Sequence, residues 1–124
     1  AAMIDFENKS LFKLKRDSSY AEKVEALLLD DEEVFESYKT MRDGVVFTNK
    51  RIVAVNVQGM TGKKKDFTSI PYSKIQAYSV ETAGTLDLDA ELEIYISSVG
   101  RVRFEFVGDS KVVGISKLIS KTIL

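Results

Sequence analysis

The chain has 124 residues, a formal net charge of −1, and no cysteine, histidine or tryptophan. This length fits one domain with one core, and the nearly balanced charge gives no global field that would attract nucleic acid. Without cysteine and histidine, the chain lacks thiolate chemistry, the usual general base near neutral pH and the common zinc ligands. Composition therefore argues against an enzyme, and we expect no cofactor, no metal and no nucleic-acid partner.

Nothing in the sequence reads as a membrane span or a secretory leader. The longest apolar runs are "VEALLL" and "RIVAVNV", which are far shorter than a span requires. No charged start followed by an apolar core and a small-residue cleavage site is present. We therefore expect a cytoplasmic location.

Residues 1–17 show no clean hydrophobic period. Basic and apolar side chains alternate irregularly in this segment, among them Lys13, Lys15 and Arg16. One interpretation is an arm that touches a membrane or a neighbouring subunit, and the other is a leader packed on its own domain. We divide the chain into an N-terminal arm, 1–17, and one domain, 18–124.

A helix is predicted at the start of the domain. Ser19 and Glu22 have the spacing of a capping box. Apolar residues then recur on one helical face, and the acidic run 30–33 should end the helix because acids oppose the dipole at a C-terminus. The apolar face consists of Ala21, Val24, Leu27 and Leu28.

From Glu33 onward the hydrophobic period changes to two, which indicates strands. Their links are too short for parallel crossovers, so we expect an antiparallel arrangement. Strands of this number, with one apolar face, curl into a sandwich or a partly open barrel. The seven predicted strands are Glu33–Met41, Val45–Thr48, Arg51–Val57, Lys65–Tyr72, Ile75–Thr82, Ala90–Ser97 and Val102–Val107.

A final helix is predicted after Gly108, with Asp109 or Ser110 as its cap. Its apolar stripe would let it cover the open end of the barrel. The stripe consists of Val112, Ile115, Ile119 and Ile123, with Leu118 beside it. The fold class is therefore mainly β, a seven-stranded barrel closed by a C-terminal helix and preceded by a short helix.

The stretch "QGMTGKKKDF" contains two glycines and three consecutive lysines. It is not a nucleotide-binding P-loop, because Gly59 and Gly62 are only three apart, no Ser or Thr follows the first lysine, and strand rather than helix comes next. A hairpin turn explains the glycines. The lysines are either solubilising charges or a site for a phosphate or an anionic lipid, and this candidate site consists of Lys63, Lys64 and Lys65.

Four acidic residues gather between residues 81 and 91. Paired carboxylates serve glycosidases or bind calcium, but the D-x-D spacing here lacks the further ligands and the helix of an EF-hand. A solvated loop or an intersubunit contact is the alternative explanation. The four residues are Glu81, Asp87, Asp89 and Glu91.

Several motifs resemble those of the bacterial pleckstrin-homology-like domains, a family of unknown function. They are "FTNKR" at 47–51, "QGMTGKK" at 58–64, "SIPY" at 69–72 and "ETAGTLDLDAEL" at 81–92. The resemblance implies two near-orthogonal sheets closed by the last helix, assembly into ring-like homo-oligomers, and no catalytic residues. The family's phosphoinositide-binding relatives carry a basic set in the first long loop, whereas this chain has only "RDG" at 42–44.

Three hypotheses follow. The first is a non-catalytic scaffold that forms homo-oligomers and binds protein through the arm, the first helix and open sheet edges. The alternative is peripheral membrane or anionic-ligand binding through Lys63, Lys64 and Lys65, helped by the arm's cations. An enzyme would have to rely on carboxylates or lysines, and no constellation of these residues indicates one.

Overall fold

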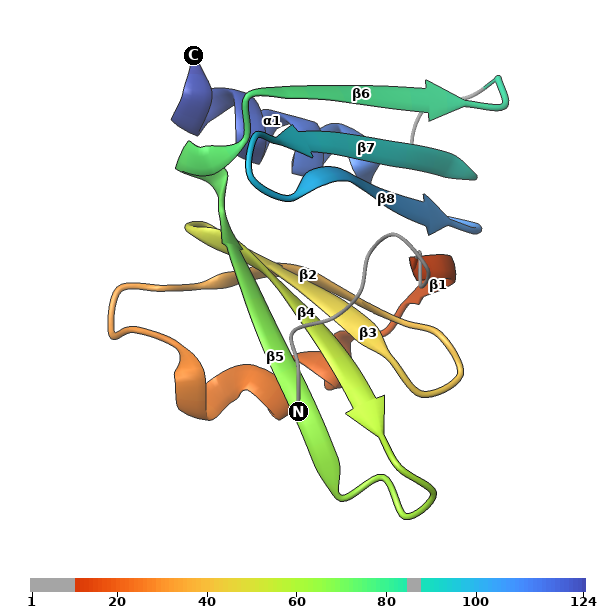
Figure 1. Ribbon diagram of the computed structural model, residues 1–124. Helices are drawn as coiled ribbons and strands as arrows, with labels where there is room; N and C mark the ends of the chain where they lie inside the picture. The colour runs from red at the N-terminus through yellow and green to blue at the C-terminus, as the bar shows by residue number, and fades with distance from the viewer. Residues whose placement is uncertain (1–10, 85–87) are drawn as a thin grey trace.

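The computed structural model of the chain describes residues 11–84 and 88–124 (Figure 1). Strands dominate these residues, and one regular α-helix closes the chain. The strands are β1 Leu11–Arg16, β2 Val34–Lys39, β3 Gly44–Thr48, β4 Arg51–Gln58, β5 Lys64–Pro71, β6 Ala77–Thr82, β7 Ala90–Ile96 and β8 Gly100–Phe106. The helices are the 3₁₀ segments η1 Ser18–Leu27 and η2 Tyr72–Lys74, and the α-helix α1 Val112–Ile123.

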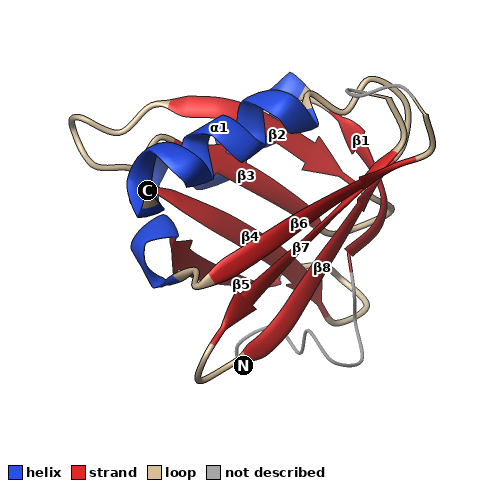
Figure 2. Ribbon diagram, turned by 90° about the horizontal axis from the view of Figure 1, so that it is seen from above, coloured by secondary structure: helices blue, strands red, loops and turns tan. Residues whose placement is uncertain are grey.

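The eight strands form one continuous ladder in the order β5-β4-β3-β2-β1-β8-β7-β6. The ladder folds over so that β2 to β5 cross beneath β6 to β8, and α1 lies across the opening between the two halves (Figures 1 and 2). The mainly β class with a closing C-terminal helix is thus confirmed. The expected pair of separate sheets is instead one sheet, because β1 pairs with both β2 and β8.

Strand β1 corrects three expectations. The described residues contain eight strands rather than seven, and β1 runs parallel to β8, so the sheet is not antiparallel throughout. Residues 11–16 also lie at the centre of the ladder rather than in an arm separate from the domain, while residues 1–10 lie outside the described residues. The strand escaped prediction because its register shifts between Leu11 and Leu14, where Lys13 has a φ of 54°, and this irregularity breaks the two-residue period.

The first helix differs from its prediction in type and cap. It is a 3₁₀ helix, and the Asp17 carboxylate caps it by accepting a bond from the Ser19 backbone N–H at 3.0 Å. Tyr20 and Val24 pack on the outer face of β3 and β4 in a second apolar cluster, whereas Leu27 is 44% exposed. The helix ends at Leu27, before the acidic run, as expected.

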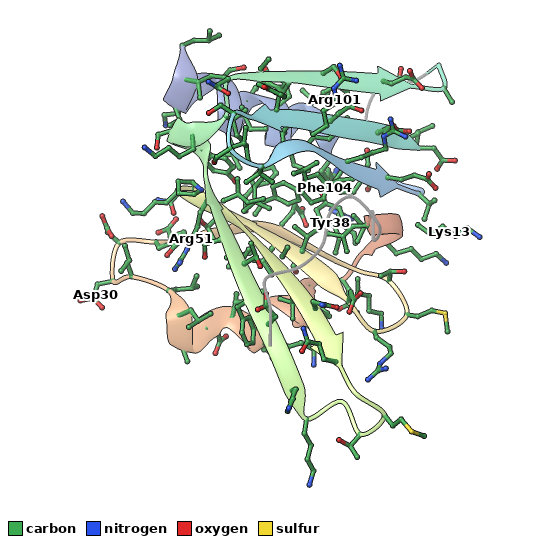
Figure 3. All side chains as sticks on the ribbon, viewed as in Figure 1. Lys13, Asp30, Tyr38, Arg51, Arg101 and Phe104 are labelled. Atoms are coloured by element: carbon green, nitrogen blue, oxygen red, sulfur yellow. The ribbon has the colours of Figure 1, made fainter. Side chains whose placement is uncertain are left out.

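The main core lies between the two halves of the sheet. Strand residues alternate inward as the sequence indicated, and Val102, Phe104 and Phe106 are all buried. Figure 3 shows Tyr38 and Phe104 pointing into this space, while Lys13 points away into solvent. The ring centroids of Tyr38 and Phe106 lie 4.7 Å apart, with the two ring planes tilted by 57°.

Helix α1 closes the core with the predicted face. Val112, Ile115 and Ile119 are buried, and the partly buried Leu118 and Ile123 pack beside them. The cap is neither Asp109 nor Ser110, since the N-cap position is Lys111 in a left-handed conformation with no side-chain capping bond. The Tyr38 hydroxyl instead donates to the Ser110 carbonyl and ties the start of the helix to β2.

Candidate functional site

The three candidate lysines lie at the hairpin that joins β4 to β5. The antiparallel pairing of these strands and the positive φ of Gly59 and Gly62 confirm a turn rather than a phosphate loop. Lys63, Lys64 and Lys65 are exposed, and no acidic side chain within 11–84 and 88–124 forms an ion pair with them.

A neighbouring loop adds to this tip. The Arg42 guanidinium, between β2 and β3, donates to the Gly59 carbonyl and so joins the two loops. Met41 and Met60 are almost fully exposed, at 99% and 102%. The basic tip therefore consists of Met41, Arg42, Met60 and Lys63 to Lys65, and the sequence revealed only its lysines.

The cations of the predicted arm are not part of the basic tip. Lys15 pairs across the sheet with Lys39 of β2. Arg16 forms ion pairs with Glu36 at 3.2 Å and with Asp109 at 3.2 Å. The help that we expected from Lys13, Lys15 and Arg16 therefore has no support in this arrangement.

The acidic cluster lies at the other end of the molecule. Glu81, Asp89, Glu91 and Glu105 line a shallow hollow of about 220 Å³, and Asp87 lies outside the described residues. Asp89 accepts a bond from the Gly108 backbone N–H at 2.6 Å and so joins the β6–β7 loop to the end of β8. Arg103 lies 2.8 Å from Glu91.

These contacts make the cluster structural within the described part of the chain. The described residues contain no group of three or more side chains that could hold a metal ion. The Arg103 guanidinium further offsets the charge of the carboxylates around it. We therefore assign no chemistry to this hollow.

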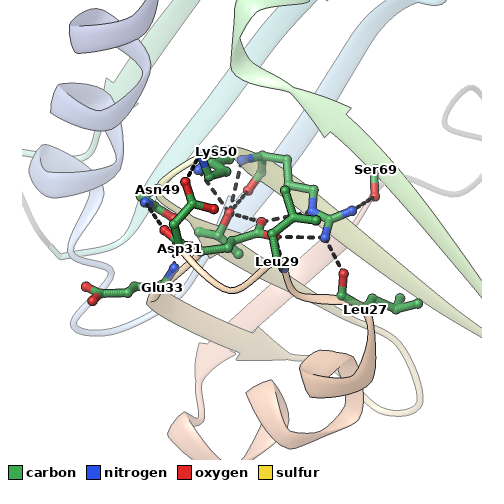
Figure 4. Close-up of polar contacts among 10 residues, drawn as sticks. Leu27, Leu29, Asp31, Glu33, Asn49, Lys50 and Ser69 are labelled. Atoms are coloured by element: carbon green, nitrogen blue, oxygen red, sulfur yellow. Dashed lines mark hydrogen bonds and ion pairs between the residues drawn. The ribbon is translucent and has the colours of Figure 1, made fainter.

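A buried carboxylate, Glu32, pairs with Arg51, and this pair is among the polar contacts drawn in Figure 4. The Glu32 carboxylate accepts bonds from Arg51 Nη2 at 2.8 Å, Arg51 Nε at 2.9 Å and the Thr48 hydroxyl at 2.6 Å. Burial alone would raise the pKa of this carboxyl, but the bonds from Arg51, Thr48 and the Leu29 N–H outweigh it and lower the pKa to about 2.

This pair fastens the loop before β2 to the β3–β4 hairpin. Arg51 also donates to the Leu27 carbonyl at 2.7 Å, at the end of η1. A carboxylate held ionised by so many donors cannot act as a base or an acid near neutral pH. The signals for this pair in the sequence are weak, since Glu32 belongs to an acidic run and Arg51 opens a largely apolar strand.

Within residues 11–84 and 88–124 the sheet ends in β5 and β6, each of which pairs with one neighbouring strand. The ladder of β4 and β5 sets the direction of the unpaired groups of β5. Tyr72 N–H donates to the Lys50 carbonyl, and the β4–β5 register continues without interruption from Arg51 and Pro71 to Gln58 and Lys64. Because hydrogen-bonded and non-hydrogen-bonded pairs alternate, the N–H and C=O groups of Lys65, Phe67 and Ser69 point to the free side.

Strand β6 offers an edge of different composition. Its outward residues Ala77 and Ser79 are small and exposed, and Glu81 is its one charged residue. On its inner side, the Tyr78 hydroxyl donates to the Ser116 carbonyl of α1 at 3.4 Å. Helix α1 thus holds this edge strand in place without pairing with its backbone.

Both the sequence and this fold, an eight-stranded open sheet covered by a C-terminal helix, have known relatives. Residues 5–123 match the family described as "Bacterial PH domain". The chain belongs to the bacterial PH domain family. The resemblance drawn from the sequence motifs is therefore confirmed.

Relatives of this PH domain include two uncharacterised proteins of Bacillus subtilis. YjqA is 45% identical over 101 residues, which cover 80% of this chain and 81% of that protein. YozO is 32% identical over 111 residues, which cover 90% and 95% of the two chains. Neither name states an activity.

Two crystal structures share the fold. A DUF1696 family protein with a pleckstrin-homology domain from Shewanella loihica has a TM-score of 0.73 and 37% identity, over 91% of this chain and 99% of that one. A pleckstrin homology domain from Shewanella amazonensis has a TM-score of 0.59 and 38% identity, over 100% and 92%. In the described residues of this PH domain, no helix is long and apolar enough to cross a membrane.

Proposed function

We propose that this PH domain is a non-catalytic scaffold that associates with copies of itself and binds other proteins through the free edges of its sheet. The observation that carries the proposal is the open ladder, in which, among the strands that the structure describes, β5 and β6 each pair with one strand. An unpaired strand presents a row of N–H and C=O groups that another chain can pair with. The cytoplasmic location expected from the sequence is part of the proposal.

Strand β6 is the edge best suited to a second copy. Lysines and prolines on an edge strand work against its pairing with a second copy of the same strand, and β5 carries both, in Lys64, Lys65 and Pro71. Strand β6 has neither, and its exposed Ala77 and Ser79 leave room for another backbone to approach. Two β6 strands that pair antiparallel would extend the sheet across a two-fold axis.

The titratable groups with shifted pKa values support a non-catalytic role. Burial raises the pKa of Tyr20 to about 12 and raises that of Tyr72 further above its usual range. The Tyr72 hydroxyl donates to the Thr48 carbonyl at 2.7 Å inside the core. Together with the ionised Glu32, these groups hold the fold and are not poised for proton transfer near neutral pH.

Light scattering on size-exclusion fractions tests self-association. We expect the mass to be at least twice 13.9 kDa, in whole-number multiples, with a dimer giving the smallest mass and a ring a larger one. Ser79→Lys places a guarding charge on the β6 edge and should lower the mass, whereas Ser18→Lys, the same change on η1, should not. A mass of 13.9 kDa at every concentration contradicts self-association.

The basic tip favours a second candidate function, contact with an anionic membrane surface. Exposed methionines beside unpaired lysines combine an apolar group for the interface with charges that attract anionic lipid, worth ~1 kcal/mol each. Vesicles that contain phosphatidylserine should sediment with the protein at low salt. Replacement of Lys63, Lys64 and Lys65 by glutamine should abolish this, while the charge-matched change of Lys23, Lys117 and Lys121 should not.

A further inference from the structure

A second feature lies against the free edge of β5. At the end of this strand, where the fold leaves a gap beside the β7–β8 turn, the structure has an apolar notch of about 130 Å³. Its apolar walls come from Ile70 and Pro71 of β5 and from Ile96 and Val99. Ile70 and Ile96 are almost fully buried, while Val99 is 39% exposed, so the notch opens outward.

The volume of the notch suits one apolar side chain. Cavities of ~150 Å³ lined by aliphatic residues accept a benzene-sized molecule in other proteins. Thr68 and Ser69 of β5 also line the notch, so it adjoins the backbone groups of Ser69 that point to the free side. A chain that pairs with β5 would carry its side chains past the notch at every second residue.

The charges around the edge are of one sign. Lys64 and Lys65 begin β5, and Lys74 lines the notch at its other end. None of the three forms an ion pair with a residue of the described ranges. Asp66, the one acid of β5, is partly buried and accepts the Thr68 hydroxyl at 2.8 Å. The edge therefore presents net positive charge at both ends.

We infer that the β5 edge and its notch bind an extended acidic segment of another protein, with one apolar side chain between its acidic residues. The segment pairs with the backbone of Lys65, Phe67 and Ser69, places the apolar side chain among Ile70, Ile96 and Val99, and brings its acids to the lysines. This inference rests on the proposed role in protein binding and specifies the chemistry of the partner. A second β5 strand would bring its own lysines to an edge that is positive at both ends, which the charges disfavour.

The probe is a fluorescein-labelled peptide, Glu-Asp-Thr-Leu-Thr-Asp-Glu, followed by fluorescence anisotropy. We expect saturable binding to the wild-type protein. The peptide with alanine in place of leucine should bind more weakly, and Lys-Lys-Thr-Leu-Thr-Lys-Lys should not bind. No binding of the acidic peptide overturns the inference.

Two pairs of variants separate strand pairing from simple charge attraction. Ser69→Pro removes an N–H that points to the free side, whereas Ser69→Ala keeps it, and both lose the bond from Arg51 to the Ser69 hydroxyl. We expect affinity to fall roughly ten-fold in the proline variant relative to the alanine variant. Val99→Asp should weaken binding more than Ser98→Asp, and this pair decides the matter if Ser69→Pro does not fold.

If the two variants of each pair bind the acidic peptide with equal affinity, the inference is overturned, and charge attraction to the lysines explains the binding. If Ser69→Pro lowers the solution mass relative to Ser69→Ala and the peptide does not bind, the edge holds a second copy, which also overturns it. The two proposals fail separately. If the wild-type protein is a monomer and binds the peptide, only the self-association proposal is overturned. If Ser79→Lys lowers the solution mass but the wild-type protein does not bind the peptide, only this inference is overturned.

Discussion

The Arg51 guanidinium contacts the Glu32 carboxylate at 2.8 Å across 19 residues of sequence, with the Glu32 side chain fully buried. The pair joins the loop before β2 to the start of β4. Buried ion pairs repay their desolvation only with good geometry and further bonds, and here Thr48 and the Leu29 N–H supply those bonds. Removal of one partner should therefore be costly.

Arg51→Met tests this cost. The substitution keeps much of the aliphatic stem but leaves Glu32 buried without its counter-charge, so we expect the free energy of unfolding to fall by about 3 kcal/mol. The control is Arg103→Met, whose exposed pairs with Glu91 and Glu93 should contribute less than about 1 kcal/mol. Urea denaturation of both variants measures the difference, and equal losses would contradict a special role for the buried pair.

Acid should weaken the fold partly through Glu32. The pKa of this carboxyl is about 2 in the folded state, against an ordinary value of 4.5. The unfolded state therefore binds more protons between these values, and the stabilisation is complete above about pH 5 and is lost as the pH falls toward 2. In Glu32→Gln, the free energy of unfolding should depend less steeply on pH over this range. An unchanged slope would show that other carboxylates set the acid sensitivity.

Strand β1 should be indispensable to the domain. Leu14 is fully buried in the main core, so Leu14→Ala should lower the free energy of unfolding by about 2–5 kcal/mol. Lys13→Gly provides the contrast, because Lys13 is exposed and has a positive φ that glycine adopts freely. We expect that variant to keep or slightly gain stability in thermal melts. An unchanged free energy of unfolding in Leu14→Ala would show that the domain does not depend on β1.

Two glycines should respond in opposite ways to alanine. A Cβ at Gly44 would lie 2.6 Å from the Tyr38 carbonyl oxygen and against the Tyr20 ring, so Gly44→Ala should cost about 1–3 kcal/mol. The three atoms nearest to a Cβ at Gly114 in α1 belong to the outer end of the Phe35 ring, and this side chain is 41% exposed, so it has solvent to move into. Gly114→Ala should therefore gain up to about 1 kcal/mol from helix propensity. Chemical denaturation of both variants checks the signs.

Hydrophobic periods and apolar runs explain what was predictable. Strands β6 to β8 alternate between more and less buried residues, β3 and β4 are nearly continuous apolar runs, and α1 repeats its apolar residues at helical spacing, so these elements were read from the sequence. In β1 the buried residues Leu11 and Leu14 are three apart across an irregular register, which no period of two detects. Because β1 was not predicted, the edge strands of the sheet could not be identified either. Strand β1 covers the sides of β2 and β8 that a seven-stranded arrangement would leave open.

The residues of the candidate sites also include some that the sequence predicts and others that only the fold brings together. Lys63 to Lys65 were visible as a charge run, whereas Arg42 joins the basic tip through a bond to Gly59 that only the fold creates. The notch beside β5 combines residues 70 and 96, from strands that do not pair. Contacts between such distant segments leave no local pattern for sequence reasoning to detect.

Amide hydrogen exchange along β5, measured by NMR on dilute protein, tests the central claim that this edge is free. The N–H groups of Asp66, Thr68 and Ile70 point toward β4 and should exchange slowly, whereas those of Lys65, Phe67 and Ser69 should exchange fast. This alternation is the result that the account predicts. Slow exchange at all six positions in dilute protein would show that the edge is already covered, and would contradict the account.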